Sequence, residues 1–445
     1  MKILKTVVTI SILIGWMSSM DAGYLIKAGK RSRSAIDRLE FKNVADMCTI
    51  AQDPAYYARQ LRPMSAARQK FYDREYDKAY FSPWKLNKME ESEEELFWQI
   101  RFVQKKKIYD GKKRLIPPKK WQWWIKNSNF EKLNTVKGRA ISVRHSDMRA
   151  FPTDTPAYRN PWTKTEGFPF DYNQHSELHP NVPLFVSHYS LDGRWAFVQA
   201  AHANGWVKVK DIAIVDTSFI KSFKTGRYGI AVKDDLFLYD GRKKISIIKL
   251  STIFPYCKSG KCLLTAARNK KGRAVIRKIP LPSRDLVAPK PLPFTRKNVA
   301  KIVRELYNEP YGWGGKMQTR DCSATTRDYF AVFGIFLKRN SAKQAKAGKS
   351  ISIKGLPKEK KKATIIKKAK AFQSMLYVPG HITLYLGRYK DEPVVMHTYW
   401  GVRLTDWSKY PLCRTIITTT EPGKELKKIR EKSKLINTLQ KIINF

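Results

Sequence analysis

Acidic residues and cysteines are scarce in this 445-residue chain. It holds 38 Asp and Glu against 86 Lys and Arg, which gives a formal net charge of +48, and it has five Cys. So large a positive charge indicates contact with anionic polymers such as wall peptides, envelope phosphates or nucleic acid. A general basic bias without a specific partner is equally consistent with it. Five cysteines cannot all pair with one another.

Several catalytic signatures are missing. The chain has no His-Glu-x-x-His run and no Gly-x-Ser-x-Gly run, the signatures of zinc proteases and of nucleophile-elbow hydrolases. The stretch Ala347-Gly-Lys-Ser imitates the end of a phosphate-binding loop, but position 343 is Lys where Gly is needed. His175 and His179 have a ligand-like spacing, yet Pro180 and its turn-forming context favour a loop over a metal site. We expect neither a metal nor another cofactor.

Long apolar runs are also missing, apart from one at the start of the chain. Lys2 and Lys5 precede a largely apolar run over residues 7–17, which is too short to span a bilayer securely. The pattern is typical of a signal peptide cleaved near Ala22, and no Cys follows the run to carry a lipid anchor. We therefore expect an exported protein of the periplasm or cell envelope, where nucleic acid is not an expected partner.

One of the five cysteines has a distinctive context. Cys322 follows the Gly-rich aromatic segment Tyr311-Gly-Trp-Gly-Gly and precedes an apolar helical pattern over residues 323–337. A helix N-terminus favours the thiolate form of a cysteine, which is the nucleophile. His381 and His397 follow in strand-like sequence, and this chain order is that of papain-like peptidases. Cys322 alone would be interpreted as structural, but the loop, the helix start and the two histidines together favour catalysis.

At these residues the chain resembles the NlpC family of bacterial cell-wall cysteine peptidases, in particular its branch with an N-terminal clip and two SH3-like domains. The motifs that carry the resemblance are Tyr-Gly-Trp-Gly-Gly, Asp-Cys-Ser, Arg-Asn-Ser-Ala-Lys-Gln, Gly-His-Ile-Thr-Leu-Tyr-Leu-Gly and His-Thr-Tyr-Trp-Gly-Val-Arg. The resemblance implies that Cys322 is the nucleophile, that His381 is the base, and that His397 orients His381.

The resemblance also implies a substrate pocket. Asp321 and Ser323 would bind the free amino end of the substrate, Tyr311 would lie near the reacting carbonyl, and Ser341 would contact the glutamyl carboxylate. A Tyr of the first SH3-like domain would close the pocket, and Tyr172 is one candidate. The implied reaction is thioester-mediated hydrolysis of the γ-D-glutamyl–diamino acid amide in peptidoglycan stem peptides that begin with free L-Ala.

Three other functions remain as alternatives. One is a non-catalytic wall-binding protein built from SH3-like modules, another is an acyltransferase that uses the same Cys–His pair, and the third is a secreted nucleic-acid binder. Intact Cys322, His381 and His397 weigh against the first alternative. Acyl-enzymes pass to amines as well as to water, so the second is the closest in chemistry.

We expect an α+β protein with a papain-like domain after two small β-barrels. Its parts are a signal peptide at 1–22, a helical and irregular clip at 23–136, SH3-like barrels at 137–216 and 217–290, a papain-like catalytic domain at 291–420 and a basic amphipathic helix at 421–445. Cys257 and Cys262 flank a predicted hairpin turn, where a disulfide and a free pair are equally consistent with the spacing.

Overall fold

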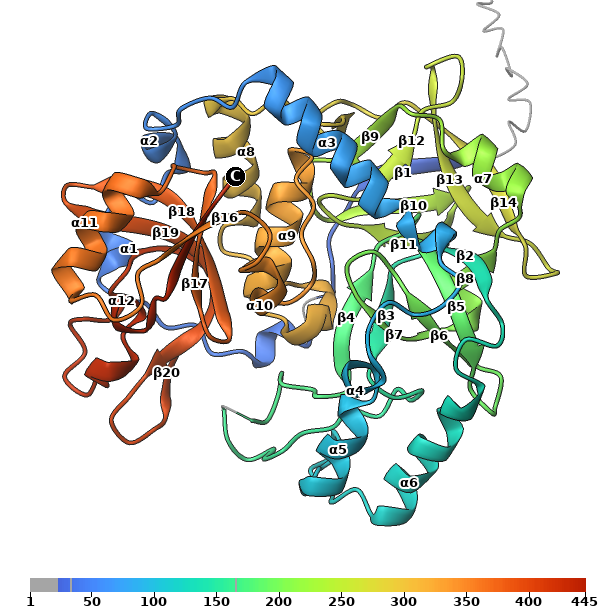
Figure 1. Ribbon diagram of the computed structural model, residues 1–445, viewed down its shortest axis with the longest axis horizontal. Helices are drawn as coiled ribbons and strands as arrows, with labels where there is room; N and C mark the ends of the chain where they lie inside the picture. Colours follow the sequence, from blue (N-terminus) through green and yellow to red (C-terminus); the bar gives the residue numbers. More distant parts are fainter. Residues whose placement is uncertain (1–22, 33, 165) are drawn as a thin grey trace, which may run out of the picture.

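The computed structural model describes residues 23–32, 34–164 and 166–445. The predicted signal peptide, residues 1–22, therefore lies outside the described residues. A β-rich lobe and a mixed lobe lie side by side, with helices α8 (Arg296–Leu306) and α9 (Cys322–Val332) between the two sets of strands (Figure 1). Within the described ranges, every helix is too short or too polar to cross a bilayer.

The first β unit is a seven-stranded antiparallel sheet with strand order β4-β3-β7-β6-β5-β2-β8. Its strands are β2 (Gly138–Ser142), β3 (Ser146–Arg149), β4 (Gln174–Leu178), β5 (Pro183–Tyr189), β6 (Trp195–Gln199), β7 (Asn204–Lys208) and β8 (Ile212–Ile214), with the short helix η4 (Val209–Asp211) before the last. These strands fall inside the predicted range 137–216. The pairing departs from sequence order, since β2 lies between β5 and β8 while β3 lies between β4 and β7.

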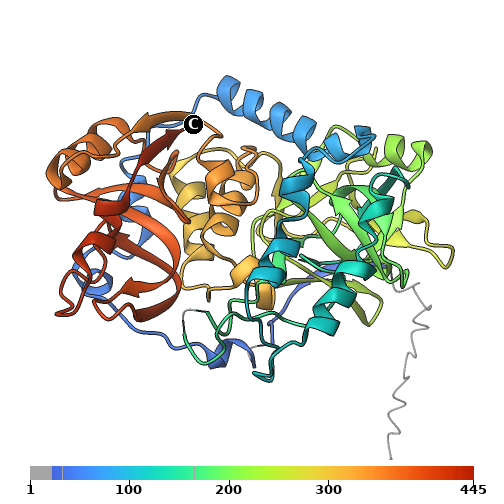
Figure 2. The same ribbon diagram turned by 60° about the horizontal axis from the view of Figure 1, so that its bottom comes forward.

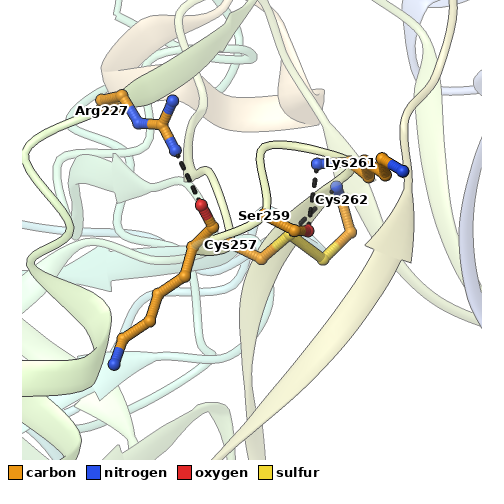
Figure 3. The surroundings of a disulfide bond; sticks show 6 residues. Arg227, Cys257, Ser259, Lys261 and Cys262 are labelled. Atoms are coloured by element: carbon orange, nitrogen blue, oxygen red, sulfur yellow. Dashed lines mark hydrogen bonds between the residues drawn. A yellow bond between two sulfur atoms is a disulfide. The ribbon is translucent and has the colours of Figure 1, made fainter.

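The second β unit consists of three smaller sheets that follow the helix α7 (Thr217–Phe223). Its strands are β9 (Tyr228–Ala231), β10 (Leu236–Asp240), β11 (Lys243–Ile248), β12 (Ile253–Pro255), β13 (Cys262–Arg268), β14 (Ala274–Pro280) and β15 (Val287–Pro289). A disulfide joins Cys257 and Cys262 at the turn before β13 (Figure 3). Cys48, Cys322 and Cys413 are free thiols, so the predicted nucleophile is outside the disulfide.

The mixed lobe contains the predicted Cys322, His381 and His397 and is called the catalytic lobe for that reason. It has a six-stranded sheet in the order β16-β21-β17-β18-β19-β20. The strands are β16 (Lys349–Ser352), β17 (Ser374–Val378), β18 (His381–Tyr389), β19 (Glu392–Arg403), β20 (Lys409–Thr419) and β21 (Lys441–Asn444), and α10 (Ser341–Gln344) and α11 (Lys358–Lys368) complete the lobe with α8 and α9. The helix that we expected over residues 323–337 ends earlier, at Val332, because Gly334 takes a positive φ of 82° and reverses the chain.

The predicted amphipathic helix at 421–445 is wrong. The segment forms turns, the short helices η6 (Glu431–Ser433) and α12 (Leu435–Thr438), and the strand β21. This strand pairs with β16 on one side and β17 on the other, and Ile442 and Ile443 are fully buried. The apolar residues of this segment recur at the spacing of a helix, but the edges of β16 and β17 have backbone groups that only a strand can pair with. The chain end is therefore part of the catalytic sheet.

The N-terminal segment wraps the rest of the molecule. It contains β1 (Tyr24–Ala28), η1 (Ile36–Arg38), α1 (Asp46–Thr49), α2 (Pro54–Ala58), α3 (Ala66–Tyr80), η2 (Ser82–Lys85), α4 (Glu93–Leu96), α5 (Trp98–Lys105), α6 (Pro118–Asn127) and η3 (Phe130–Lys132). Strand β1 pairs with β10, while α3 runs across both lobes (Figure 2). In α3, Gln69 donates to the Phe333 carbonyl at 3.2 Å and Tyr80 donates to the Asn181 carbonyl at 2.8 Å. This helix therefore fixes the catalytic lobe against the first β unit.

Buried ion pairs of Arg320, which is close to the predicted nucleophile in the sequence, join the two lobes. The fully buried guanidinium of Arg320 binds Asp328 at 2.7 Å in the catalytic lobe and also pairs with Glu309 and with Asp234 of the second β unit. Because Arg320 stands two residues before Cys322, these pairs fix the backbone at the start of α9. A buried cation with three carboxylates is costly to disrupt.

Candidate active site

Cys322 is the first residue of α9, as the sequence predicts. The helix begins here because the Asp321 carboxylate accepts the Ala324 N–H at 3.0 Å and so caps the helix. Cys322 is half-buried, and the backbone N–H groups of Ile382 and Ser323 lie within hydrogen-bond range of its thiol. Ile382 follows His381 in β18, so the thiol lies against the start of the strand that carries the predicted base.

The Gly-rich loop before Cys322 packs directly on the first β unit. Gly314 and Gly315, inside η5 (Trp313–Gln318), have φ values of 62° and 84°, a region that side chains with a Cβ avoid. A Cβ on Gly314 would lie 2.5 Å from the Gln174 carbonyl oxygen, and one on Gly315 would lie 2.8 Å from Cδ of Glu177. The two glycines therefore bring the loop, and with it Tyr311, onto strand β4.

The two predicted histidines form a relay that ends at Thr418. His381 Nε2 lies 2.9 Å from His397 Nδ1, and His397 Nε2 lies 3.1 Å from Thr418 Oγ1. The Thr418 hydroxyl donates to the Thr419 carbonyl at 2.8 Å, so its oxygen accepts from His397 Nε2–H. His397 Nδ1 is then an acceptor, and His381 Nε2–H donates to it. This network leaves the lone pair of His381 on Nδ1, free to take a proton.

Burial shifts the pKa of the Cys322 thiol and that of the His381 imidazole in the directions that favour their neutral forms. Burial, followed by the negative charge of Asp321, raises the pKa of the Cys322 thiol to about 12. Burial, followed by the positive charge of Lys409, lowers the pKa of His381 to about 3. Both directions disfavour a preformed thiolate–imidazolium pair in this buried environment.

Asp321 and Ser323 are held by an arginine that the sequence analysis did not select. Arg339 donates to both carboxylate oxygens of Asp321, at 3.0 and 2.6 Å, and to Ser323 Oγ at 2.7 Å. Burial raises the pKa of Asp321, but the charge and hydrogen bonds of Arg339 outweigh burial, so the pKa lies below its usual value. Arg339 belongs to the Arg-Asn-Ser motif, so this motif could have identified it as a site residue.

A cavity of about 420 Å³ opens at Cys322. Six of the predicted site residues line it: Tyr172, Tyr311, Asp321, Cys322, Ser323 and Ser341. Its aromatic wall includes Tyr172 and Trp313, whose rings lie 5.7 Å apart, and Phe102 stacks on Tyr172 at 5.0 Å from outside the lining. His381 and His397 are not among the lining residues, but His381 directly follows Gly380, which lines the cavity, and contacts His397. The structure thus brings the eight predicted residues to one place.

Other lining residues gave no usable signal in the sequence. Glu91 and Trp98 come from the N-terminal segment, far from Cys322 in sequence. Thr418, which contacts His397 but does not line the cavity, belongs to a Thr-rich strand with no motif. Only the fold brings such distant positions together. They were therefore missed, whereas most of the site residues that the sequence did predict stand inside motifs.

A cluster that resembles a metal site lies on the other side of α9. Side-chain ligand atoms of Glu177, His179 and Asp328 lie within 4.8 Å of one another. Lys249 binds Glu177 at 3.1 Å, and Arg327 binds Asp328 at 2.9 Å. Two cations already neutralise these carboxylates, so the cluster fits an ion-pair network better than a divalent cation.

Comparisons with known proteins agree with this geometry. Residues 308–398 match the NlpC/P60 family, residues 27–133 match the family described as the NLPC_P60 stabilising domain, N term, and residues 156–208 match the SH3 domain (SH3b1 type). The chain therefore carries an NlpC/P60 domain, and NlpC/P60 is a family of cysteine peptidases and hydrolases. The SH3 match lies in the first β unit, and the SH3-like nature of the second unit stays a prediction, as do the exact domain boundaries.

One solved structure shows a similar fold over most of the chain. An NlpC/P60 endopeptidase from Photobacterium damselae subsp. piscicida has 22% sequence identity and a TM-score of 0.80, over 91% of this chain and 98% of that one. A Bacillus cereus NlpC/P60 family protein has 12% identity and a TM-score of 0.42, over 69% of this chain and 99% of that one. No curated protein matches the sequence. The papain-like α+β fold with its N-terminal and SH3 parts is confirmed.

Proposed function

We propose that this protein hydrolyses peptidoglycan stem peptides between γ-D-glutamate and the following diamino acid, and that it prefers peptides with a free N-terminal L-Ala. The observation that carries the proposal is a free thiol at a helix N-terminus beside a histidine relay, within a cavity that holds both carboxylates and guanidinium. The structural neighbour from Photobacterium is itself described as an endopeptidase.

The proposed mechanism follows from the tautomers of the relay. His381 Nδ1 accepts the Cys322 proton as the sulfur attacks the γ-carbonyl carbon, and His397 stabilises the resulting imidazolium through Nδ1. The unpaired N–H of Cys322 at the start of α9, with Tyr311 nearby, stabilises the oxyanion. His381 then protonates the departing amine, a thioester remains on Cys322, and water attacks it with His381 as base.

The cavity also supports the proposed orientation of the substrate. It has two cationic side chains, Arg339 and Lys343, and two anionic ones, Glu91 and Asp321. Arg339 Nε is buried and makes no hydrogen bond among the described residues, so it is free to bind the α-carboxylate of glutamate beside Ser341. The net charge of +48 would attract acidic muropeptides and anionic envelope polymers.

Purified protein and two synthetic peptides test the proposal. Free L-Ala-γ-D-Glu-meso-diaminopimelate should be cleaved at the γ-glutamyl bond, and its N-acetylated form should be cleaved at least tenfold more slowly. Equal rates on the two peptides would refute the amino-end preference, and no cleavage of either would refute the proposed function. The place of action outside the cytoplasm is part of the proposal and is tested by fractionating cells.

A further inference from the structure

A second cavity, of about 740 Å³, lies between helix α6 of the N-terminal segment and the first β unit. Strands β6 and β7 and the loops beside them form part of its lining, and Arg268 of the second β unit completes it. It shares no lining residue with the cavity at Cys322. The proposed mechanism therefore uses none of the residues that form it.

An exposed tryptophan lines this second cavity. Trp123 is 49% exposed, and no aromatic ring or cation of the described residues packs against its indole. The other two lining tryptophans are buried and already have partners. The ring of Trp124 lies 5.8 Å from that of Phe151, and Lys208 Nζ lies 5.5 Å from the ring centre of Trp195. Of these three indoles, only that of Trp123 is available to a ligand.

The lining also has more cations than its carboxylates neutralise. Five cationic and two acidic side chains contribute to it. Lys208 pairs with Asp154 at 2.8 Å, and Arg194 pairs with Asp192 at 3.1 Å. The lining cations that have no carboxylate partner among the described residues are Lys120, Lys210 and Arg268. The cavity therefore attracts an anionic ligand.

Hydrogen bonds hold the walls of this cavity in position. The Asn127 side chain, at the end of α6, accepts the Asp192 N–H at 3.1 Å. The buried guanidinium of Arg149 donates to the carbonyls of Thr153 and Thr155, at 3.1 Å in each case, and so fixes the lining loop between them. Walls that are positioned without a ligand reduce the entropy cost of binding one.

An acidic saccharide matches this lining in chemistry. One face of a sugar ring carries C–H groups that pack against the negative face of an indole, and its carboxylate or phosphate binds free ammonium and guanidinium groups. Asp154 and Asp192 supply oxygens that accept hydrogen bonds from sugar hydroxyls. A polynucleotide fits less well, because the two carboxylates repel its phosphates and one available indole cannot stack successive bases.

We propose that this cavity is a binding site for a chain of acidic sugars, separate from the cavity at Cys322. Trp123 packs against a sugar ring in this site, and Lys120, Lys210 and Arg268 bind the negative groups of the chain. The inference does not rest on the proposed function, since the two cavities have no residue in common.

Calorimetry on the purified protein tests the site with four oligomers. Hyaluronan hexasaccharide carries carboxylates, pentamannose phosphate carries phosphate, chitohexaose is neutral, and oligo(dT) carries phosphates without a pyranose chain. At least one of the two acidic saccharides should bind, and the tighter of them identifies the anionic group that the site recognises. Chitohexaose should bind at least tenfold more weakly than that saccharide, and oligo(dT) should bind no more tightly.

Variants inside and outside the cavity then locate the site. Trp123→Ala should weaken binding of the preferred saccharide at least tenfold, as expected when a stacked aromatic is truncated, while Trp123→Tyr keeps a flat ring and should stay within about threefold. Trp162→Ala removes another exposed indole, which does not line the cavity, and should change affinity less than twofold.

A second pair of variants tests the cations. Lys120→Gln with Lys210→Gln should weaken binding about tenfold, because two ion pairs with the ligand are lost. Lys119→Gln with Lys126→Gln removes the same charge from α6 outside the lining and should change affinity less than twofold. Trp123→Ala should cleave the free-amine peptide at a rate within twofold of the wild type, so the outcome at this site is separate from that of the proposed function.

Four results would overturn the inference. They are no binding of either acidic saccharide, equal affinity for chitohexaose, tighter binding of oligo(dT), and unchanged affinity in Trp123→Ala. An equal loss in the two double lysine variants would also contradict it, because the net charge of the protein alone would then account for binding.

Discussion

Replacing Thr418 with Val should disable the base without touching the substrate cavity. Thr418 is fully buried in β20, and Val has nearly the same shape. The substitution removes the oxygen that accepts His397 Nε2–H at 3.1 Å. His397 then either keeps a buried N–H without an acceptor or moves its proton to Nδ1. In the second case His381 must carry its proton on Nδ1. Its lone pair then lies on Nε2 and cannot accept the proton of the Cys322 thiol.

The size of the effect follows from the cost of the orphaned group. A buried N–H without an acceptor costs about 1–3 kcal/mol. At about 1.4 kcal/mol per factor of ten, the reactive tautomer becomes about 5- to 150-fold less populated. We therefore expect kcat to fall by about that factor, while KM stays near its wild-type value because Thr418 does not line the cavity.

The assay is the release of diaminopimelate from the free-amine peptide, followed for the wild type, Thr418→Val and Thr418→Ser. Thr418→Ser keeps the hydroxyl and should retain most of the activity. Nitrogen NMR of the imidazoles should show the proton of His381 on Nε2 in the wild type and on Nδ1, at least in part, in Thr418→Val. Activity of Thr418→Val within twofold of the wild type would refute the tautomer argument.

Three further predictions concern stability. Arg320→Met should lower the free energy of unfolding by about 3–5 kcal/mol, because three buried carboxylates lose their shared cation; a loss below about 1 kcal/mol in chemical denaturation would contradict this. Gly315→Ala should destabilise the protein and lower its melting temperature, because φ is positive and the added methyl meets Glu177; an unchanged melting temperature would argue against the tight loop packing. Acidification from pH 7 to 5 should also destabilise it. Six of the seven histidines have a pKa lowered by burial, so the unfolded chain takes up protons near pH 6.5 that the folded protein does not bind until lower pH. Each of these histidines can lower the free energy of unfolding by up to about 1.4 kcal/mol for every pH unit below about 6.5. A constant melting temperature between pH 7 and pH 5 would contradict the prediction.

Local features of the site were predictable because they depend on residues that are neighbours in the sequence. The start of α9 at Cys322 follows from the Asp321 cap, and the strand at His381 follows from alternating apolar residues. Tyr172 was selected as a candidate on the resemblance alone, and it does line the cavity. The catalytic and binding roles of all these residues remain predictions.

Long-range features were not predictable in the same way. The pattern over 421–445 fits a helical period, but the pairing of β21 between two strands decides its structure. Arg339 and Glu91 meet in one cavity only after the clip, the first β unit and the catalytic lobe pack together. No spacing rule relates residues that far apart in sequence.

The most direct measurement is the rate at which purified Cys322→Ala cleaves L-Ala-γ-D-Glu-meso-diaminopimelate. If this thiol forms the thioester, the variant should lose activity by a factor of about 10⁴ or more, as enzymes do when a catalytic nucleophile is removed. It should still bind L-Ala-γ-D-Glu, because the cavity walls remain. Cleavage by Cys322→Ala within tenfold of the wild-type rate would contradict the account.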